Sequence, residues 1–300
     1  MKSQREITQY VFQKIWTLTT ERIEIDEIGL QLIQELYPTI SDLEANELWE
    51  KIRKNVMKFL QKTIEDCKNR KVLPRYVFSR NFSTLLVRYD RFVQNKDSEE
   101  REKIRLAILH RNDIQNAFFH LHWRQFEKLC AYLLKCLGCK FAWITPKIKE
   151  GGIDICGIAE PNSLIFSKGI VKAKIGIIGQ VKNWQRKIDE PHIDEFRTKF
   201  NDFLKGDHKI IPKLPREFLE CTQFYALMMV SSSFTSDAIA AAQKGEIKIL
   251  LYDGEQIAEN LITLHDFQVV KGWFIKHNGK EAFHEKNFIS WLKNIKINEI

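Results

Sequence analysis

The fold is decided by two stretches of the sequence, GGIDI at residues 151–155 and IGIIGQVK at residues 175–182. Each stretch is short, apolar and rich in isoleucine, which is typical of a buried β-strand. Side chains alternate between the two faces of a strand, so Gln180 and Lys182 lie on the same face. If the two strands pair, Asp154 joins them, and a carboxylate, an amide oxygen and an ammonium converge on one spot.

This predicted cluster has the chemistry of a site for a hard metal ion. The Asp154 carboxylate, the Gln180 amide and the Val181 backbone carbonyl supply oxygen ligands, which Mg²⁺ prefers. Lys182 can orient an attacking water molecule or stabilise charge that develops on phosphate oxygens. The alternatives are an aspartate that caps a turn and a strand that ends in solvent. Burying a glutamine and a lysine without partners costs several kcal/mol, and a metal ion and a phosphate would supply partners. The cluster therefore predicts hydrolysis of phosphodiester bonds.

Two further groups of charged residues lie near the predicted cluster. Glu127 follows Phe126 at the edge of the apolar stripe of a predicted helix, from which it can reach the rim of the sheet. There it would bind a second cation or hold a metal-bound water, unless it is an ordinary exposed glutamate. Arg186 and Lys187 follow the second strand, and we interpret them as phosphate contacts, with plain surface charge as the alternative.

The chain carries a net charge of +8, and the excess lies between Lys51 and Arg91. This segment has 12 Lys and Arg residues against 3 Asp and Glu residues, a net charge of +9. Such density indicates a polyanionic partner, although a solvated helix face is the alternative. Arg75, Arg80 and Arg88 lie in a predicted basic hairpin within this segment, and they are our candidates for contacts with the polyanion.

Composition limits the class of protein. A hydrophobic content of 44% is enough for a core, and 29% charged residues indicate a soluble surface. No apolar run is long enough to span a bilayer, and the first residues lack the apolar core of a signal peptide. We therefore expect a cytoplasmic protein with no membrane partner. Cys136 and Cys139 form a CxxC motif without the second half of a zinc site, so we expect reduced, packed thiols.

The predicted elements divide the chain into three parts. Residues 1–110 are mostly helical and basic; Ser41 and Glu44 form a capping box there, and a polar linker is expected at 95–102. Residues 111–265 alternate helices and strands, which predicts an α/β fold with a mixed sheet flanked by helices. Residues 266–300 form a C-terminal extension of unknown role. In the middle part we expect helices at 112–137, 191–204, 235–244 and 255–264, and strands at 140–146, 153–159, 175–182, 224–231 and 247–252.

Six short motifs occur together along the middle part of the chain. They are WRQFEKL at 123–129, Gly138, GGID at 151–154, GQVK at 179–182, SFTSDA at 233–238 and ILLYDG at 249–254. On these motifs, residues 115–265 resemble the catalytic domain of Mrr-type restriction endonucleases, a branch of the PD-(D/E)xK nuclease superfamily. The resemblance implies a restriction-endonuclease-like fold and DNA cleavage that depends on Mg²⁺, for which Mn²⁺ can substitute. It also implies that Asp154, Gln180 and Lys182 form the metal-binding and catalytic set, with Glu127 as the helix-borne acid.

The chain departs from the superfamily pattern in two places. Gln180 stands where the superfamily usually has a second acid, which lowers the charge of the site and should weaken metal binding. Glutamine is nevertheless common at this point in the Mrr-like branch. The interval between Asp154 and Gln180 is also long, and it contains loop-like stretches at 161–163 and 167–169.

Together, these features predict a two-domain DNA endonuclease. We expect residues 1–110 to form the recognition domain for double-stranded DNA, with Arg75, Arg80 and Arg88 as contacts that weaken as salt rises. One site per chain must cut two strands, so we expect a homodimer. The expected role is restriction of foreign DNA, with dependence on base modification left open.

Three alternatives remain. A structure-selective nuclease for repair or junction processing would share the site but not the target. A catalytically silent DNA-binding protein would keep the fold, but it has no need to keep Asp154, Gln180 and Lys182 together. A nucleotide-binding α/β protein is disfavoured, because GGIDICG at 151–157 has the spacing of neither common phosphate-binding glycine loop.

Overall fold

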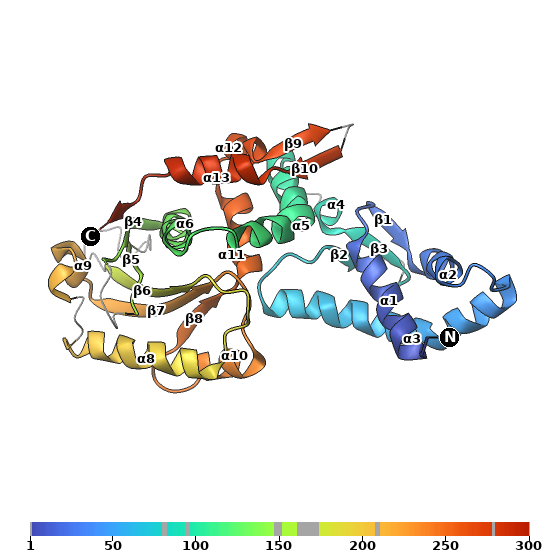
Figure 1. The fold of residues 1–300 in the computed structure, drawn as a ribbon, viewed down its shortest axis with the longest axis horizontal. Coiled ribbons are helices and arrows are strands. Elements are labelled where there is room, and N and C mark those ends of the chain that lie inside the picture. Colours follow the sequence, from blue (N-terminus) through green and yellow to red (C-terminus); the bar gives the residue numbers. More distant parts are fainter. Residues whose placement is uncertain are drawn as a thin grey trace. The chain divides into compact units, whose positions relative to one another are not determined.

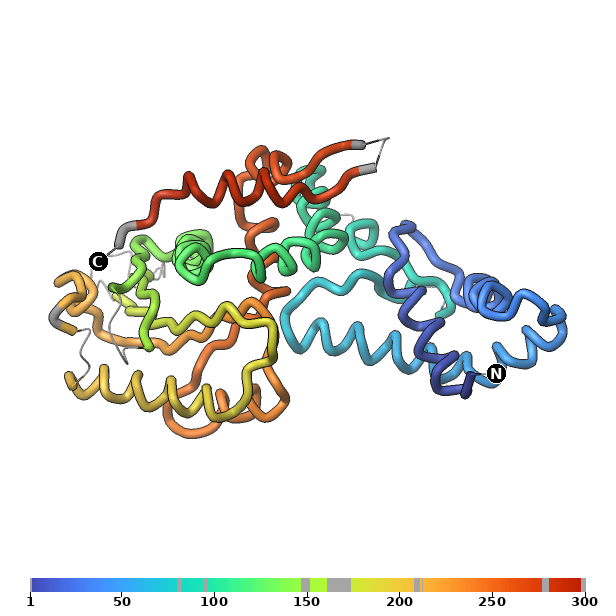
Figure 2. Tube along the Cα trace, in the orientation of Figure 1, coloured from blue at the N-terminus to red at the C-terminus, as the bar shows by residue number. Residues whose placement is uncertain are grey.

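The computed structural model describes residues 2–79, 83–93, 96–146, 152–160, 174–207, 211–277 and 280–299. Arg80, Gly151 and the loop-like stretches at 161–163 and 167–169 lie outside these residues. The chain divides into two compact units, Met1–Leu109 and His110–Ile300 (Figures 1 and 2). Each unit has a hydrophobic core of its own, so each is described separately.

The first unit is mainly helical and contains one small sheet. Its elements are α1 (Gln4–Thr17), β1 (Arg22–Glu24), α2 (Ile25–Leu36), α3 (Asp42–Asn69), β2 (Tyr76–Phe78), β3 (Leu85–Arg88), α4 (Tyr89–Phe92) and the start of α5 (Ser98–Phe118). The strands are antiparallel, in the order β1-β3-β2. The capping box predicted at the start of α3 is confirmed, because the Ser41 hydroxyl accepts from the Glu44 N–H and the Glu44 carboxylate accepts from the Ser41 N–H.

The second unit is built around a mixed sheet, which has six strands in the described part of the chain. Its elements are α6 (Trp123–Cys136), β4 (Cys139–Ile144), β5 (Ile155–Ala159), β6 (Ile175–Lys182), α8 (Glu190–Leu204), a 3₁₀ turn (Ile211–Lys213), α9 (Arg216–Leu219), β7 (Gln223–Val230), α10 (Ser236–Ala242), β8 (Ile249–Tyr252), α11 (Gly254–Leu264), α12 (Phe267–Gly272), β9 (Phe274–His277), β10 (Lys280–Phe283), α13 (Glu285–Asn294) and β11 (Asn298–Glu299). The strand order is β11-β4-β5-β6-β7-β8. Neighbours are antiparallel from β4 to β6 and parallel from β6 to β8.

Helices cover both faces of this sheet. α6 and α11 lie on one face, and α8 and α10 lie on the other (Figure 1). Ile178 of β6 belongs to the core that includes Phe196 of α8, so its side chain lies on the α8 face. Gln180 and Lys182 follow Ile178 at steps of two and therefore share that face. The predicted fold class, a mixed sheet flanked by helices and preceded by a mostly helical region, is confirmed.

The helix predicted over 112–137 is wrong in its extent, because α5 ends at Phe118 and α6 begins at Trp123. His122 has extended backbone angles and acts as the N-cap of α6, and Asn183 donates to the carbonyl of Leu121 at the break. The expected linker is also partly helical. α5 starts at Ser98, and an i,i+4 pair between Lys103 and Glu99 stabilises its charged first turns.

The C-terminal segment belongs to the fold of the second unit. β9 and β10 form a hairpin, and β11 adds a parallel strand beside β4 (Figure 2). Trp273 and Phe288 are almost completely buried and pack edge to face with ring centroids 5.3 Å apart. α13 also contacts α6, where Lys128 Nζ donates to the carbonyl of Lys293. Among the described helices, none is both long and apolar enough to cross a membrane.

Candidate active site

The backbone of Asp154 is fixed between two strands. Its N–H donates to the carbonyl of Gly179 at 2.9 Å, and its own carbonyl accepts from the Thr145 N–H at 2.9 Å. The last antiparallel pair of β5 and β6 joins Ile155 to Gly179, and the Asp154 N–H bonds to the same glycine, so Asp154 lies just before β5, beside the part of β6 that carries Gln180. The structure therefore brings Asp154 next to the strand that the sequence predicts as its neighbour.

The two oxygens of the Asp154 carboxyl differ in their contacts. Oδ2 accepts from the Val181 N–H at 2.7 Å, whereas no described residue donates to Oδ1. Burial raises the pKa of this carboxyl above its ordinary value, although the Val181 N–H and the nearby cations Lys182, Lys199 and Arg124 act in the opposite direction. Asp154 is half-buried, and a carboxylate that is both desolvated and underpaired favours a further cation beside it.

Gln180 is the clearest sign of a missing ligand. Its side chain is 1% exposed, and Oε1 has no hydrogen-bond partner among the described residues. A buried acceptor without a partner is destabilising and rare, so it suggests a bound group. Together with Asp154 Oδ1 it offers oxygen donors, which fit a hard divalent ion. In the described part of the chain no three His, Cys, Asp or Glu side chains cluster as a metal site, so such an ion would depend on these mixed oxygen ligands.

Lys182 lies at the end of β6 against an aromatic ring. Its Nζ is 5.0 Å from the ring centroid of Trp184, and the guanidinium carbon of Arg186 is 4.7 Å from the same centroid. The ring of His192 packs edge-on against Trp184 at 5.0 Å. Cation–π attraction of this kind restrains a flexible lysine. Trp184 thus positions two of the predicted cations, a role that nothing in the sequence indicates.

Glu127 enters from the other side of the sheet, on α6. Its side chain is buried and accepts from Arg124 at 2.9 Å, and Arg124 also donates to the carbonyl of Thr145 at 2.9 Å. Burial, followed by the charges of Glu127 and Asp154, raises the pKa of the Cys130 thiol well above its usual range. Both carboxylates therefore lie within electrostatic reach of the same thiol, as expected if Glu127 approaches the site.

Two further charged residues, which the sequence patterns do not predict, lie near the site on α8. Gly152 has a φ of +61°, and a Cβ at this position would lie 2.4 Å from Cδ of Lys199. Lys199 forms an ion pair with Glu195, which lowers the pKa of that carboxyl; Lys182 and His192 lower it further. The spacing of Glu195 and Lys199 is that of an ordinary surface pair on a helix, so the sequence contains no signal for their place at the site.

Two of the arginines predicted to contact a polyanion have other partners in the first unit. Arg75 donates to the carbonyls of Thr17, Leu18 and Ile108. Arg88 is 6% exposed and donates to both carboxylate oxygens of Asp90, at 2.6 and 3.1 Å. These contacts fix the hairpin to its surroundings, so the positions of Arg75 and Arg88 give no support to a role in DNA binding. Arg186 and Lys187, in the second unit, are exposed.

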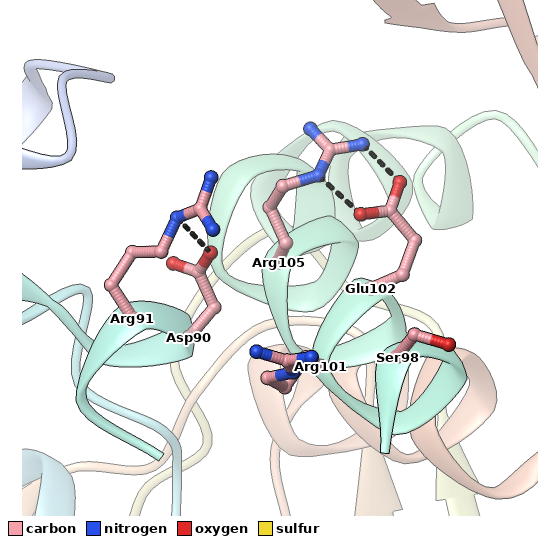
Figure 3. A pocket seen from close by; sticks show the side chains of 6 residues that line it. All are labelled: Asp90, Arg91, Ser98, Arg101, Glu102 and Arg105. Carbon is pink, nitrogen blue, oxygen red and sulfur yellow. Dashed lines mark hydrogen bonds and ion pairs between the residues drawn. The ribbon is translucent and has the colours of Figure 1, made fainter. Parts of the chain in front are cut away.

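A small pocket in the first unit shows the same pairing of arginines with acids (Figure 3). Arg105 donates to Glu102 through two hydrogen bonds of 2.8 and 2.6 Å. Arg91 lies 3.9 Å from Asp90 and also forms an ion pair with Glu21. Most of the positive charge around this pocket is therefore neutralised within the unit.

The geometry can be compared with known proteins. Residues 119–211 match the family model of the Mrr catalytic domain, described as a restriction endonuclease. This segment is similar to the catalytic domain of Mrr-type restriction endonucleases. The matched segment includes α6, β5 and β6, and with them Asp154, Gln180, Lys182 and Glu127. The resemblance predicted from the motifs is thus confirmed.

Two solved structures are similar to parts of this chain. The MspJI restriction endonuclease in complex with a 27-mer oligonucleotide has a TM-score of 0.37 and 14% identity, over 62% of this chain and 39% of that one. The DNA modification-dependent restriction endonuclease AspBHI has a TM-score of 0.36 and 11% identity, over 66% of this chain and 40% of that one. The chain thus matches about two fifths of the length of each. No curated protein matches it.

Proposed function

We propose that the chain is a Mg²⁺-dependent endonuclease that hydrolyses phosphodiester bonds of double-stranded DNA, in the manner of a restriction enzyme. One observation carries the proposal. Within a segment that matches a restriction endonuclease model, the unpaired buried oxygen of Gln180 lies on the strand next to an underpaired, half-buried carboxylate, Asp154. An inert copy of the fold would have no reason to bear the cost of both groups.

Each residue of the site has a distinct role in this proposal. Asp154, Gln180 and the backbone carbonyl of Val181 would hold the Mg²⁺, for which Mn²⁺ can substitute. When bound, the ion supplies Lewis-acid chemistry for attack by water on a phosphate. Lys182, restrained by Trp184, orients the water and stabilises negative charge on the phosphate oxygens. Glu127 assists from α6 as a second acid.

The proposal extends to the substrate and the assembly. Arg186 and Lys187 are exposed just beyond β6, which supports contacts with phosphates that flank the cleaved bond. A duplex has two strands related by an approximate two-fold axis, so two copies of one site cut it most simply as a homodimer. Restriction of foreign DNA is the expected role, and a structure-selective nuclease is the alternative that the same site would serve.

The proposal is tested by cleavage of two matched plasmids, one unmodified and one methylated on cytosine, with and without Mg²⁺. We expect cutting that needs Mg²⁺ and is lost in the Asp154→Ala variant, and the preferred plasmid would identify the kind of restriction. Cutting by the variant at the rate of the parent chain would overturn the site. No cutting of either plasmid, with cutting of branched or flapped DNA, would favour the structure-selective nuclease.

A further inference from the structure

One part of α3 combines a buried stripe with an unusually basic outer face. Residues 51–62 read KIRKNVMKFLQK, with five basic residues and no acid. Ile52, Val56 and Leu60 are completely buried in the core of the first unit. The other face carries four exposed lysines at steps of three or four residues, which places them in one line along the helix. This lysine row consists of Lys51, Lys54, Lys58 and Lys62.

The lysine row has no acidic partners among the residues that the structure describes. Some other cations are paired: Arg53, in the same stretch, bonds to both oxygens of Asp26, and Lys199 pairs with Glu195. By contrast, no described side chain forms an ion pair with any lysine of the row. Four like charges on one helix face repel one another. An arrangement that leaves them uncompensated favours a polyanion outside the chain.

A groove opens beside the lysine row, between α1 and α3. It is lined by Ser3, Gln4, Arg5, Thr8, Asn55, Lys58, Phe59 and Lys62, and its volume is about 680 Å³. Arg5 is exposed and adds a further cation that has no partner among the described residues. Phe59 packs against Phe12 of α1, with ring centroids 5.7 Å apart, and stays 43% exposed. The lining therefore offers cations, amide and hydroxyl donors and one apolar ring, and no acid.

We propose that the lysine row and the adjoining groove bind the sugar-phosphate backbone of DNA, an inference that rests on the proposed function. Lys51 and Lys62 are separated by about 16 Å along the helix axis, and duplex DNA carries one charge per roughly 1.7 Å of its axis, so several phosphates face the row. Arg5 contacts a further phosphate, and Phe59 packs against a sugar. Such contacts carry no sequence information, so this surface supplies affinity and orientation rather than base recognition.

The test removes charge from the row without disturbing the core. Lys54→Gln, Lys58→Gln and Lys62→Gln are introduced together into the full chain, since Gln and Lys have similar helix propensities. The background is Asp154→Ala, so that duplex DNA is bound but not cut. The matched control replaces three exposed lysines of the second unit, Lys135, Lys205 and Lys286, by Gln and changes the net charge equally. Binding is measured by fluorescence anisotropy over a range of salt concentrations.

We expect the row variant to raise the Kd by at least about tenfold and to reduce the slope of log K against log salt by about 0.9 for each lost phosphate contact. The control should change both quantities far less. Equal changes in the two variants, or none in the row variant, would overturn the docking surface. If the parent chain still cuts DNA in that case, the proposed endonuclease function is retained and only the docking surface is rejected. If the parent chain neither binds nor cuts duplex DNA, both proposals fail.

Discussion

Two sets of buried or half-buried polar side chains, one in each unit, differ in how completely they are paired. In the first unit, Arg88 and Asp90 form a buried pair in which both carboxylate oxygens accept hydrogen bonds, and Arg88 also donates to the carbonyl of Thr19. In the second unit, burial raises the pKa of the Asp154 carboxyl, and Gln180 Oε1 has no hydrogen-bond partner among the described residues. The complete pairing of Arg88 and Asp90 indicates a structural role, whereas the incomplete pairing of Asp154 and Gln180 together indicates a place for a ligand.

The largest expected effect is at Asp154. Asp154→Asn removes a metal ligand worth several kcal/mol, so cleavage of plasmid DNA should fall by at least about 10³-fold. Stability should change in the opposite direction. Because burial raises the pKa of this carboxyl, its charged form lowers the free energy of unfolding at pH values above that pKa. In chelator at pH 8 the variant should therefore be at least as stable as the parent chain.

The stability gain from Asp154→Asn should shrink as the pH falls, because below the ordinary pKa of aspartate the parent carboxyl is protonated in both states. Urea denaturation at several pH values measures this dependence. A variant that lost activity and stability together at pH 8 would show that Asp154 supports the fold, and the contrast with Arg88 would disappear.

The buried pair of the first unit should behave in the reverse manner. Arg88→Met leaves the Asp90 carboxylate buried without its main partner, which should cost about 3–5 kcal/mol in the unfolding of the first unit. Cleavage by the remaining folded protein should change little. Replacing both residues together, as Arg88→Met with Asp90→Leu, should recover part of the loss, because no unpaired charge remains. A loss of DNA binding without a loss of stability would instead show that Arg88 contacts DNA.

The sequence predicts the strand-borne part of the site well, because strand periodicity and register are local. β6 matches the predicted range of 175–182, and the Asp154 N–H bonds to Gly179 of that strand. The position of Glu127 relative to the sheet depends on where α6 begins. That start is set by the His122 cap and the Asn183 side chain, which is 61 residues further along the chain than His122. Such a distant contact leaves no local pattern.

Features that depend on tertiary packing could not be predicted from the sequence either. Lys199 reaches the site only because α8 packs over the turn at Gly152. In the C-terminal segment, the aromatic residues show neither a clear helical nor a clear strand period, and their burial follows from contacts among Trp273, Phe288 and Trp291. Charge density marks a basic segment, but it does not distinguish arginines paired inside the unit from lysines exposed on α3.

A smaller effect is expected at Gln180, whose unpaired oxygen contrasts with the fully paired Arg88 and Asp90. Gln180→Met keeps the side-chain length but removes the unpaired oxygen, so in chelator the variant should be more stable by about 1–3 kcal/mol. A hydrogen-bond-like contact with a charged partner is worth about 1.5–3 kcal/mol, so cleavage should fall by roughly 10–100-fold. Gln180→Glu serves as the matched variant, and it should lower the Mg²⁺ concentration needed for half-maximal cleavage. Destabilisation by Gln180→Met would mean that Oε1 has a partner within the fold.

The smallest effect is expected at Trp184, which acts on the site through a neutral ring. Its cation–π contacts with Lys182 and Arg186 are each worth about 0.5–2 kcal/mol, so Trp184→Leu should slow cleavage by roughly 3–30-fold. Trp184→Phe keeps an aromatic face and should lose much less. Because the ring touches neither Asp154 nor Gln180 in this proposal, the Mg²⁺ requirement should stay the same in both variants.

An equal loss in the two variants would show that ring size, rather than attraction to Lys182, matters at this position. A changed Mg²⁺ requirement would show that Trp184 also positions the metal ligands. Its role could then not be assigned to Lys182 and Arg186 alone.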